Sequence, residues 1–259
     1  MRMMKKVLGT VTVLALSVSL LAGCGSTAVS PVSSTASTAA ESTTSSVVSE
    51  TTSAAADENA AAAAQLLNDL TGSYQELWPV ILADEYQQTW LDDCTALVGE
   101  ENAEAAFEKL SSMVTGDVYG DDAVEAYANG GGAYFCGFTN SLATLTFDGE
   151  TSTISGTDKD GNVLFSHTYH YIGMEPVHGL YEFESDDADS GEFTYFFLAP
   201  DTSAETYHIE FRYGSDADAL SQYDAGDYAY WLASGISTDC DQTMIDNCIE
   251  LFCTENLAG

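Results

Sequence analysis

The second half of the chain consists of short segments rich in β-branched and aromatic residues, separated by turn signals. The segments expected to be strands lie at 133–139, 142–148, 151–157, 162–172, 179–184, 191–199 and 204–214. Asp148-Gly149 and Asp160-Gly161 separate neighbouring segments, and Asp-Gly is a strong signal for a β-hairpin. Seven short, closely spaced strands predict an antiparallel meander that closes, or nearly closes, into a barrel.

The segment before these strands has helical periodicity. Apolar residues recur at three- and four-residue intervals over 57–70, 74–82, 85–98 and 102–113, and a short helix is expected over 121–128. The run Asn129-Gly130-Gly131-Gly132 ends helix formation, and one more helix is predicted near the C-terminus, over 241–255. The expected fold class is therefore mainly β with flanking helices (α+β), an antiparallel barrel preceded by a helical region.

The first 24 residues have the features of an export signal. Arg2, Lys5 and Lys6 precede an apolar run over 7–22, which at 16 residues is shorter than the roughly 20 needed to span a membrane. The end of the run, Leu21-Ala22-Gly23-Cys24, resembles the lipobox of bacterial lipoproteins. The resemblance implies removal of 1–23 and lipid attachment at Cys24, which would leave an extracytoplasmic protein held at the cell surface by its lipid anchor alone.

Residues 24–56 are almost wholly Ser, Thr, Ala and Val and show no apolar period. Such a composition buries too little surface to offset the entropy of ordering, so we interpret it as a flexible linker. The remaining residues, 57–259, have the length of one domain.

The charge balance excludes several classes of partner. The chain carries 41 acidic and 6 basic residues, a net charge of −35, and without the three basic residues of the signal the balance is 3 − 41 = −38. A surface this acidic repels phosphate backbones and anionic headgroups, so neither nucleic-acid binding nor membrane binding through basic patches is expected. It also enriches cations close to the protein.

Five stretches of the domain match a set of known motifs in order along the chain. They are Leu70 to Pro79, Phe197 to Pro200, His208 to Gly214, Gly214 to Leu220 and the position of Trp231. In the same order they resemble the motifs W-x-G-x-W-Q-S-x-Y-P, D-H-I-I-A-P, H-F-H-F-x-Y-G, G-N-D-x-x-A-L and W-P-T-Y-Y-P of the ZinT family of zinc-binding proteins. The resemblance implies a lipocalin-like (calycin) barrel that binds one zinc ion and either supplies an ABC-type metal importer or buffers metal outside the membrane.

The three histidines that hold zinc in that family are only partly kept. The resemblance aligns them with Phe196, His208 and Glu210, of which Phe196 cannot be a ligand. Alternation along a strand independently places His208, Glu210 and Arg212 on one face, and an imidazole next to a carboxylate is a reasonable half-site for zinc. Glu210 and Arg212 could instead form a surface salt bridge.

His167 and His178 are further candidate ligands, because either could complete a site with His208 if the barrel brings them together. His170 follows His167 at a spacing that places the two on opposite faces of a strand, so they are not expected to share an ion. The acidic runs 158–162 and 186–189 lack the pattern of an EF-hand and are interpreted as turns with weak cation association at best.

Besides Cys24, five cysteines are scattered along the domain. Disulfides are permitted outside the cytosol, and two bridges among five cysteines leave 15 arrangements open. One possibility is that Cys240 bonds to Cys248 or Cys253 and fastens the C-terminal helix. The remaining two cysteines are Cys94 and Cys136.

No recognised catalytic signature or organic-cofactor motif is found in the sequence, and we do not expect an enzyme. The leading hypothesis is an extracytoplasmic lipoprotein that binds a divalent metal, zinc foremost. The rival is a lipocalin-like module that has lost its metal site and binds an apolar small ligand or a protein partner. It rests on the aromatic residues of the strands over 191–214.

Overall fold

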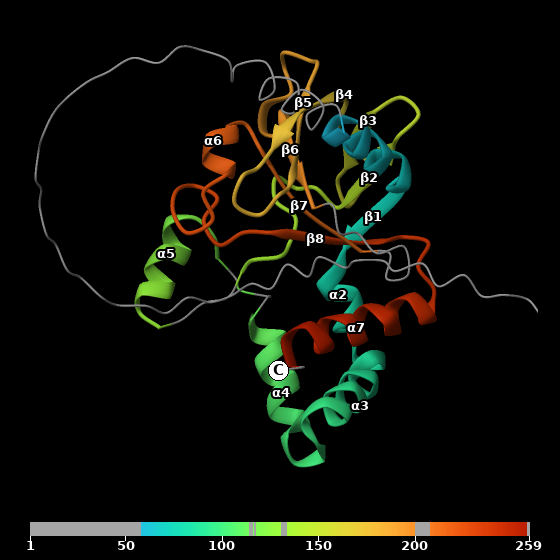
Figure 1. Cartoon of the computed structure of the whole chain (residues 1–259), viewed down its shortest axis with the longest axis vertical. Coiled ribbons are helices and arrows are strands. Elements are labelled where there is room, and N and C mark those ends of the chain that lie inside the picture. The colour runs from blue at the N-terminus through green and yellow to red at the C-terminus, as the bar shows by residue number, and fades with distance from the viewer. Residues whose placement is uncertain (1–57, 114–115, 117, 131–133, 200–207, 258–259) are drawn as a thin grey trace, which may run out of the picture.

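Eight antiparallel strands close into a barrel in which each strand pairs with the next and the last returns to the first (Figure 1). The computed structural model describes residues 58–113, 116, 118–130, 134–199 and 208–257. The strands are β1 (Gly72–Glu76), β2 (Thr144–Asp148), β3 (Thr153–Thr157), β4 (Val163–Met174), β5 (Tyr181–Ser185), β6 (Tyr195–Leu198), β7 (His208–Gly214) and β8 (Ala233–Ser237). The predicted fold class, a barrel with flanking helices, is confirmed. The predicted signal and linker lie outside the described residues.

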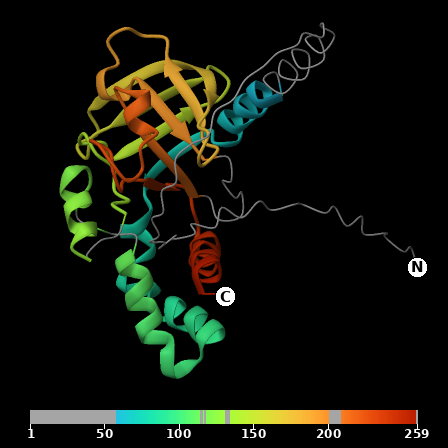
Figure 2. The ribbon, with the colours of Figure 1, turned by 60° about the vertical axis from the view of Figure 1, so that its left-hand side comes forward.

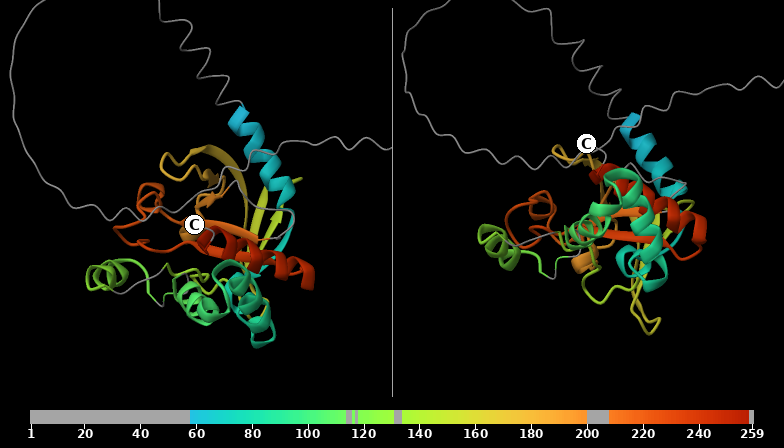
Figure 3. Two further views of the ribbon diagram at one scale, coloured as in Figure 1. Left: turned by 60° about the horizontal axis from the view of Figure 1, so that its bottom comes forward. Right: turned by 90° about the horizontal axis from the view of Figure 1, so that it is seen from below.

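Most of the helices form a layer beside the barrel, at the lower end of Figures 1 and 2. The layer contains α2 (Leu77–Ile81), the short helix η1 (Asp84–Tyr86), α3 (Gln87–Val98), α4 (Glu100–Met113) and α7 (Gln242–Leu257). Both views of Figure 3 show α7 lying alongside α3 and α4. The smaller helices α5 (Asp121–Ala128), η2 (Gly191–Phe193) and α6 (Ala217–Leu220) lie in the connections.

The structure corrects three of the sequence predictions. Over the described part of 133–139 there is an isolated parallel bridge from Phe135 to Trp231 rather than a strand. The helix predicted over 74–82 is β1 followed by the five-residue α2. The strand β8, which was not predicted, closes the barrel between β7 and β1.

The buried apolar side chains of the described residues form two separate cores. The first fills the barrel with aromatic and aliphatic side chains, including Phe147, Phe183 and Trp231, each at most 1% exposed. The second lies between the outer wall of the barrel and the helical layer, and includes Ile236 from β8, Trp90 from α3 and Ile249 from α7. The strands near this layer therefore have an inner face toward the barrel and an outer face toward the helices.

The helical segment 58–69 packs against the turn between β2 and β3. A Cβ atom added to Gly149, in the predicted Asp148-Gly149 hairpin, would lie 2.4 Å from the Cα of Asn68. The Gly149 N–H also donates to the Thr71 hydroxyl over 3.0 Å. This close approach explains why the turn requires glycine. Among the described residues, no helix is long and apolar enough to cross a membrane.

Candidate functional site

The predicted half-site on β7 lies on the outer wall of the barrel. Ile209 and Phe211 are buried in the barrel core, so the half-buried His208 and Glu210 that alternate with them point outward. His208 is paired with Ile236 of β8, which belongs to the core beneath the helical layer. The predicted sharing of one face by His208 and Glu210 is therefore confirmed.

Two thiols lie within electrostatic range of Glu210. Burial raises the pKa of the Cys136 thiol, and the negative charge of Glu210 raises it further. Burial also raises the pKa of the Cys248 thiol to about 12, with the same carboxylate as the second cause. Both thiols are therefore protonated and neutral at neutral pH, whereas zinc binds the thiolate form.

Phe196, which the motif resemblance aligns with the histidine of D-H-I-I-A-P, lies on the other side of the barrel wall. It is fully buried in the barrel core, with ring centroids 5.4 Å from Tyr169 and 5.4 Å from Tyr213. Because His208 and Glu210 face outward, the three aligned positions do not converge on one point. A zinc site of the three-histidine kind does not fit these residues.

The side chain of His178 is 33% exposed and belongs to a polar cluster around Arg212. Its ring centroid lies 3.7 Å from that of Tyr223, with the two rings tilted by 40°, and its Nδ1 lies 3.5 Å from Oε2 of the fully buried Glu175. The Arg212 guanidinium lies over the Tyr223 ring, 4.2 Å from the ring centroid. The cluster connects the β4–β5 loop to β7.

Arg212 is fully buried, so the surface salt bridge with Glu210 considered from the sequence is not its role. Its guanidinium donates to the carbonyl oxygens of Leu220, Gln222 and Tyr228. A single side chain of β7 thereby holds the connection to β8 against the barrel wall.

His167 lies at the barrel interior and His170 on the exterior, as the strand alternation predicts. The His167 side chain is 15% exposed and its Nδ1 is 2.8 Å from Oδ2 of Asp187. Its ring stacks on Phe165, with ring centroids 5.9 Å apart. Of the four residues predicted to be metal ligands, only His208 and Glu210 therefore lie next to each other.

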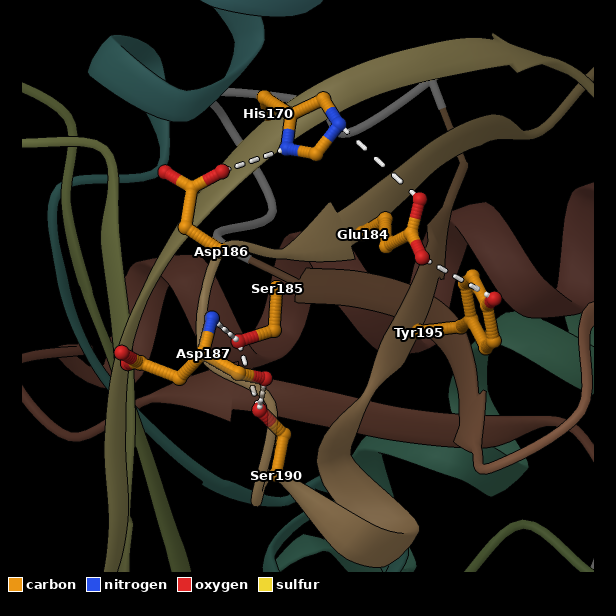
Figure 4. A network of polar contacts seen from close by, with 7 residues as sticks. All are labelled: His170, Glu184, Ser185, Asp186, Asp187, Ser190 and Tyr195. Atoms are coloured by element: carbon orange, nitrogen blue, oxygen red, sulfur yellow. Dashed lines mark hydrogen bonds and ion pairs between the residues drawn. The ribbon is translucent and has the colours of Figure 1, made fainter.

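A different histidine, His170, has the more complete set of polar neighbours (Figure 4). It stands on β4 directly opposite Glu184 of β5, and Glu184 is in turn opposite Tyr195 of β6. His170 Nδ1 is 2.8 Å from Asp186 Oδ1, and His170 Nε2 is 4.0 Å from Glu184 Oε2. The Tyr195 hydroxyl donates to Glu184 Oε1 over 3.2 Å. We call these four residues the His170 row.

The chemistry of the His170 row follows from these contacts. A proton on Nδ1 satisfies Asp186 and leaves the Nε2 lone pair directed toward Glu184. Burial raises the pKa of the Tyr195 hydroxyl, and its hydrogen bond to Glu184 raises it further, so the hydroxyl remains a donor. An imidazole nitrogen and a carboxylate oxygen thus face each other, each oriented by a second group.

This arrangement is not apparent in the sequence, because it depends on strand register. His170 and Glu184 are 14 residues apart, and a register shift between Tyr171 and Gly173 helps decide which residues of β4 and β5 are paired. The run 186–189, interpreted as a turn, supplies the histidine partners Asp186 and Asp187. The histidine and the acidic run were both visible, but their proximity was not.

Within the ranges that the structure describes, no group of three or more His, Cys, Asp or Glu side chains is arranged around one metal position. The His170 row therefore offers a metal two protein atoms, not three. The aromatic residues on which the rival hypothesis rests are largely buried in the barrel core. Binding of an apolar small ligand or of a protein partner stays a prediction.

Comparisons with known proteins return structures alone. No family model and no curated protein matches the sequence. One similar structure is the zinc-bound ZinT-like domain of AdcA from Streptococcus pneumoniae, with 15% identity, a TM-score of 0.45, and coverage of 71% of this chain and 89% of that domain. Zinc-bound AdcA from the same organism is 14% identical, with a TM-score of 0.43 and coverage of 72% of this chain and 35% of that chain. At this identity neither structure assigns ligands to this chain.

Proposed function

We propose that this chain binds a divalent transition-metal ion, zinc foremost, outside the cytoplasm. The single observation that supports the proposal is the His170 row, in which an imidazole Nε2 and a carboxylate Oε2 face each other across 4.0 Å. Export and anchoring through Cys24, and delivery to an ABC-type importer or buffering of metal, are further parts of the proposal. They derive from the lipobox-like segment and from the family resemblance.

The distances in the row are compatible with one ion after a small adjustment. Two atoms bound tetrahedrally to zinc at about 2.0–2.1 Å lie about 3.3 Å apart, so Nε2 and Oε2 must approach by about 0.7 Å. The side chains of His170 and Glu184 are 53% and 38% exposed, which leaves them room to rotate. Water would complete the coordination, and the affinity expected is below that of sites with three or four protein ligands.

The two proposed ligands have the hydrogen-bond partners that metal ligands usually have in proteins. A ligating histidine almost always donates its other ring N–H to a carboxylate or carbonyl, and ligating carboxylates are themselves hydrogen-bonded. Asp186 provides the first of these contacts and Tyr195 the second. The charges of Asp216 and Asp218 also act on Tyr195, so the local potential favours a cation.

Nitrogen coordination is what would distinguish zinc from calcium at this position. Calcium takes oxygen ligands, and the 41 acidic residues can attract it anywhere on the surface. Selective binding of zinc in the presence of excess calcium therefore reports on the imidazole rather than on the overall charge.

A zinc titration of the purified full chain in detergent, with calcium in excess, tests the proposal. We expect close to one equivalent of zinc, with affinity reduced at least tenfold in His170→Ala and in Glu184→Gln. His167→Ala is the matched control, because His167 lies on the same strand and has the same kind of Nδ1 carboxylate partner. It should bind zinc as the unaltered chain does.

Two outcomes would contradict different parts of the proposal. Absence of zinc binding at micromolar concentrations would remove the metal function altogether. Binding that survives His170→Ala but is lost in the His208→Ala, Glu210→Ala double variant would keep the function and move the site to the outer wall of β7.

A further inference from the structure

Two cysteines from distant parts of the chain meet in the core beneath the helical layer. Cys94 lies on α3 and Cys253 on α7, and each is fully buried. Their sulfur atoms are 3.9 Å apart. Among the described residues, no other pair of cysteine sulfurs lies this close together.

The packing around the pair holds the two helices in this position. Trp90, one helical turn before Cys94, contacts Phe252, the neighbour of Cys253, with ring centroids 5.9 Å apart. Trp78 of α2 lies against the same Phe252 ring at 4.8 Å. Because the aromatic contacts lie beside both cysteines, the proximity of the sulfurs belongs to a packed helix pair and not to a loose end of the chain.

We propose that Cys94 and Cys253 form a disulfide in the exported protein, which fastens the C-terminal helix α7 to α3. A disulfide bond is about 2.05 Å long, so the sulfurs must approach by about 1.9 Å through side-chain rotation. The inference does not depend on metal binding, and its link to export is the oxidising environment in which such bonds persist.

The oxidant is an external disulfide, either the oxidised form of a dithiol oxidoreductase or a low-molecular-weight disulfide. One cysteine thiolate attacks the external disulfide, forms a mixed disulfide and releases one external thiol. The second cysteine thiolate then attacks the mixed disulfide, which forms the Cys94–Cys253 bond and releases the second external thiol. The two protons of the cysteines end on the two released thiols, and the external disulfide is reduced by two electrons.

Burial indicates when the bond forms. Desolvation raises the pKa of both thiols, so in the folded protein they react slowly with external disulfides. Exchange is therefore expected before the helical layer is fully packed, and the finished bond is protected from reductants by the same burial.

Of the remaining cysteines in the described part, Cys136 and Cys248 each lie near Glu210, and Cys240 acts electrostatically on Cys248. The pairing of Cys240 with Cys253, left open from the sequence, is replaced by Cys94 with Cys253.

Peptide mapping of the full chain tests the inference. Chain isolated from the membrane fraction of exporting cells is alkylated in denaturant and digested without reduction. We expect one cross-linked pair of peptides, containing Cys94 and Cys253, that separates on reduction. Cys248→Ser should keep this pair, and Cys94→Ser should abolish it.

A refolding experiment makes the result independent of where the protein resides. Reduced, unfolded chain is refolded in a buffer of reduced and oxidised glutathione and mapped in the same way. The same cross-linked pair is expected. Alkylation of both Cys94 and Cys253, or linkage of either to a different cysteine, in both experiments would overturn the inference.

Discussion

Replacing Phe196 with histidine introduces the residue type found at the corresponding position of the motif that this segment resembles, and we expect it to destabilise the barrel without improving zinc binding. The ring is fully buried and contacts the rings of Tyr169, Tyr213 and Phe165, with centroids 5.4, 5.4 and 5.9 Å away. An imidazole buried at this position would be out of contact with solvent. His208 and Glu210 would lie on the opposite side of the barrel wall.

The expected cost follows from these contacts. Truncation of a buried phenylalanine costs about 3–5 kcal/mol, and an unsatisfied buried polar group costs about 1–3 kcal/mol. Because imidazole fills most of the space, we expect a net loss of about 3–5 kcal/mol for Phe196→His. In a domain of this size that lowers the melting temperature by roughly 10–15 °C.

Thermal unfolding of the full chain with and without zinc measures both effects. Phe196→Leu is the control, since it keeps an apolar side chain and should cost no more than about 1.5 kcal/mol. A Phe196→His variant that melts near the unaltered chain and gains zinc-dependent stabilisation would refute the placement of residue 196 inside the barrel.

Four other results are expected. Asp93→Asn should raise the free energy of unfolding at pH 7 by less than about 1 kcal/mol, because burial and acidic neighbours on α7 raise the pKa of this carboxyl; thermal unfolding at low pH, where the carboxyl is already neutral, should show no gain. Burial raises the pKa of the Cys248 thiol from 9.0 to about 12, so stability measured by urea unfolding should fall as the pH rises from about 9 to 12, where the unfolded chain ionises first. Arg212→Met should cost about 3–5 kcal/mol and expose the connection between β7 and β8 to protease, because three carbonyl contacts are lost. Urea unfolding with reductant present, which opens the bond once the chain unfolds, should show a stability lower by about 5 kcal/mol, since the loop closed by the bond is 253 − 94 = 159 residues long, and the Cys94→Ser, Cys253→Ser variant should show no effect of reductant.

The barrel could be predicted from the sequence where its signals are local. The hairpins at Asp148-Gly149 and Asp160-Gly161 join strands that lie next to each other in the chain, and both are present. The closing strands were missed because their partners are distant. β1 begins inside an apolar stripe that also fits a helix, and β8, Ala233–Ser237, contains small and polar residues with little β preference.

The site was harder to predict than the fold, because it requires knowing which residues face each other. Alternation correctly separated His167 from His170 and placed His208 beside Glu210. It could not show that Phe196 and His208 lie on opposite sides of the wall, which depends on the register of β6 against β7. Arg212 looked like a surface charge in the sequence, and its burial depends on a connection that folds back over β7.

The most direct measurement is anomalous diffraction at the zinc edge from crystals of the full chain soaked in zinc. We expect a peak of anomalous density between His170 Nε2 and Glu184 Oε2, with Asp186 still in contact with Nδ1 of His170. A peak on the outer wall of β7 beside His208 and Glu210, or zinc scattered over surface carboxylates with none at His170, would contradict it.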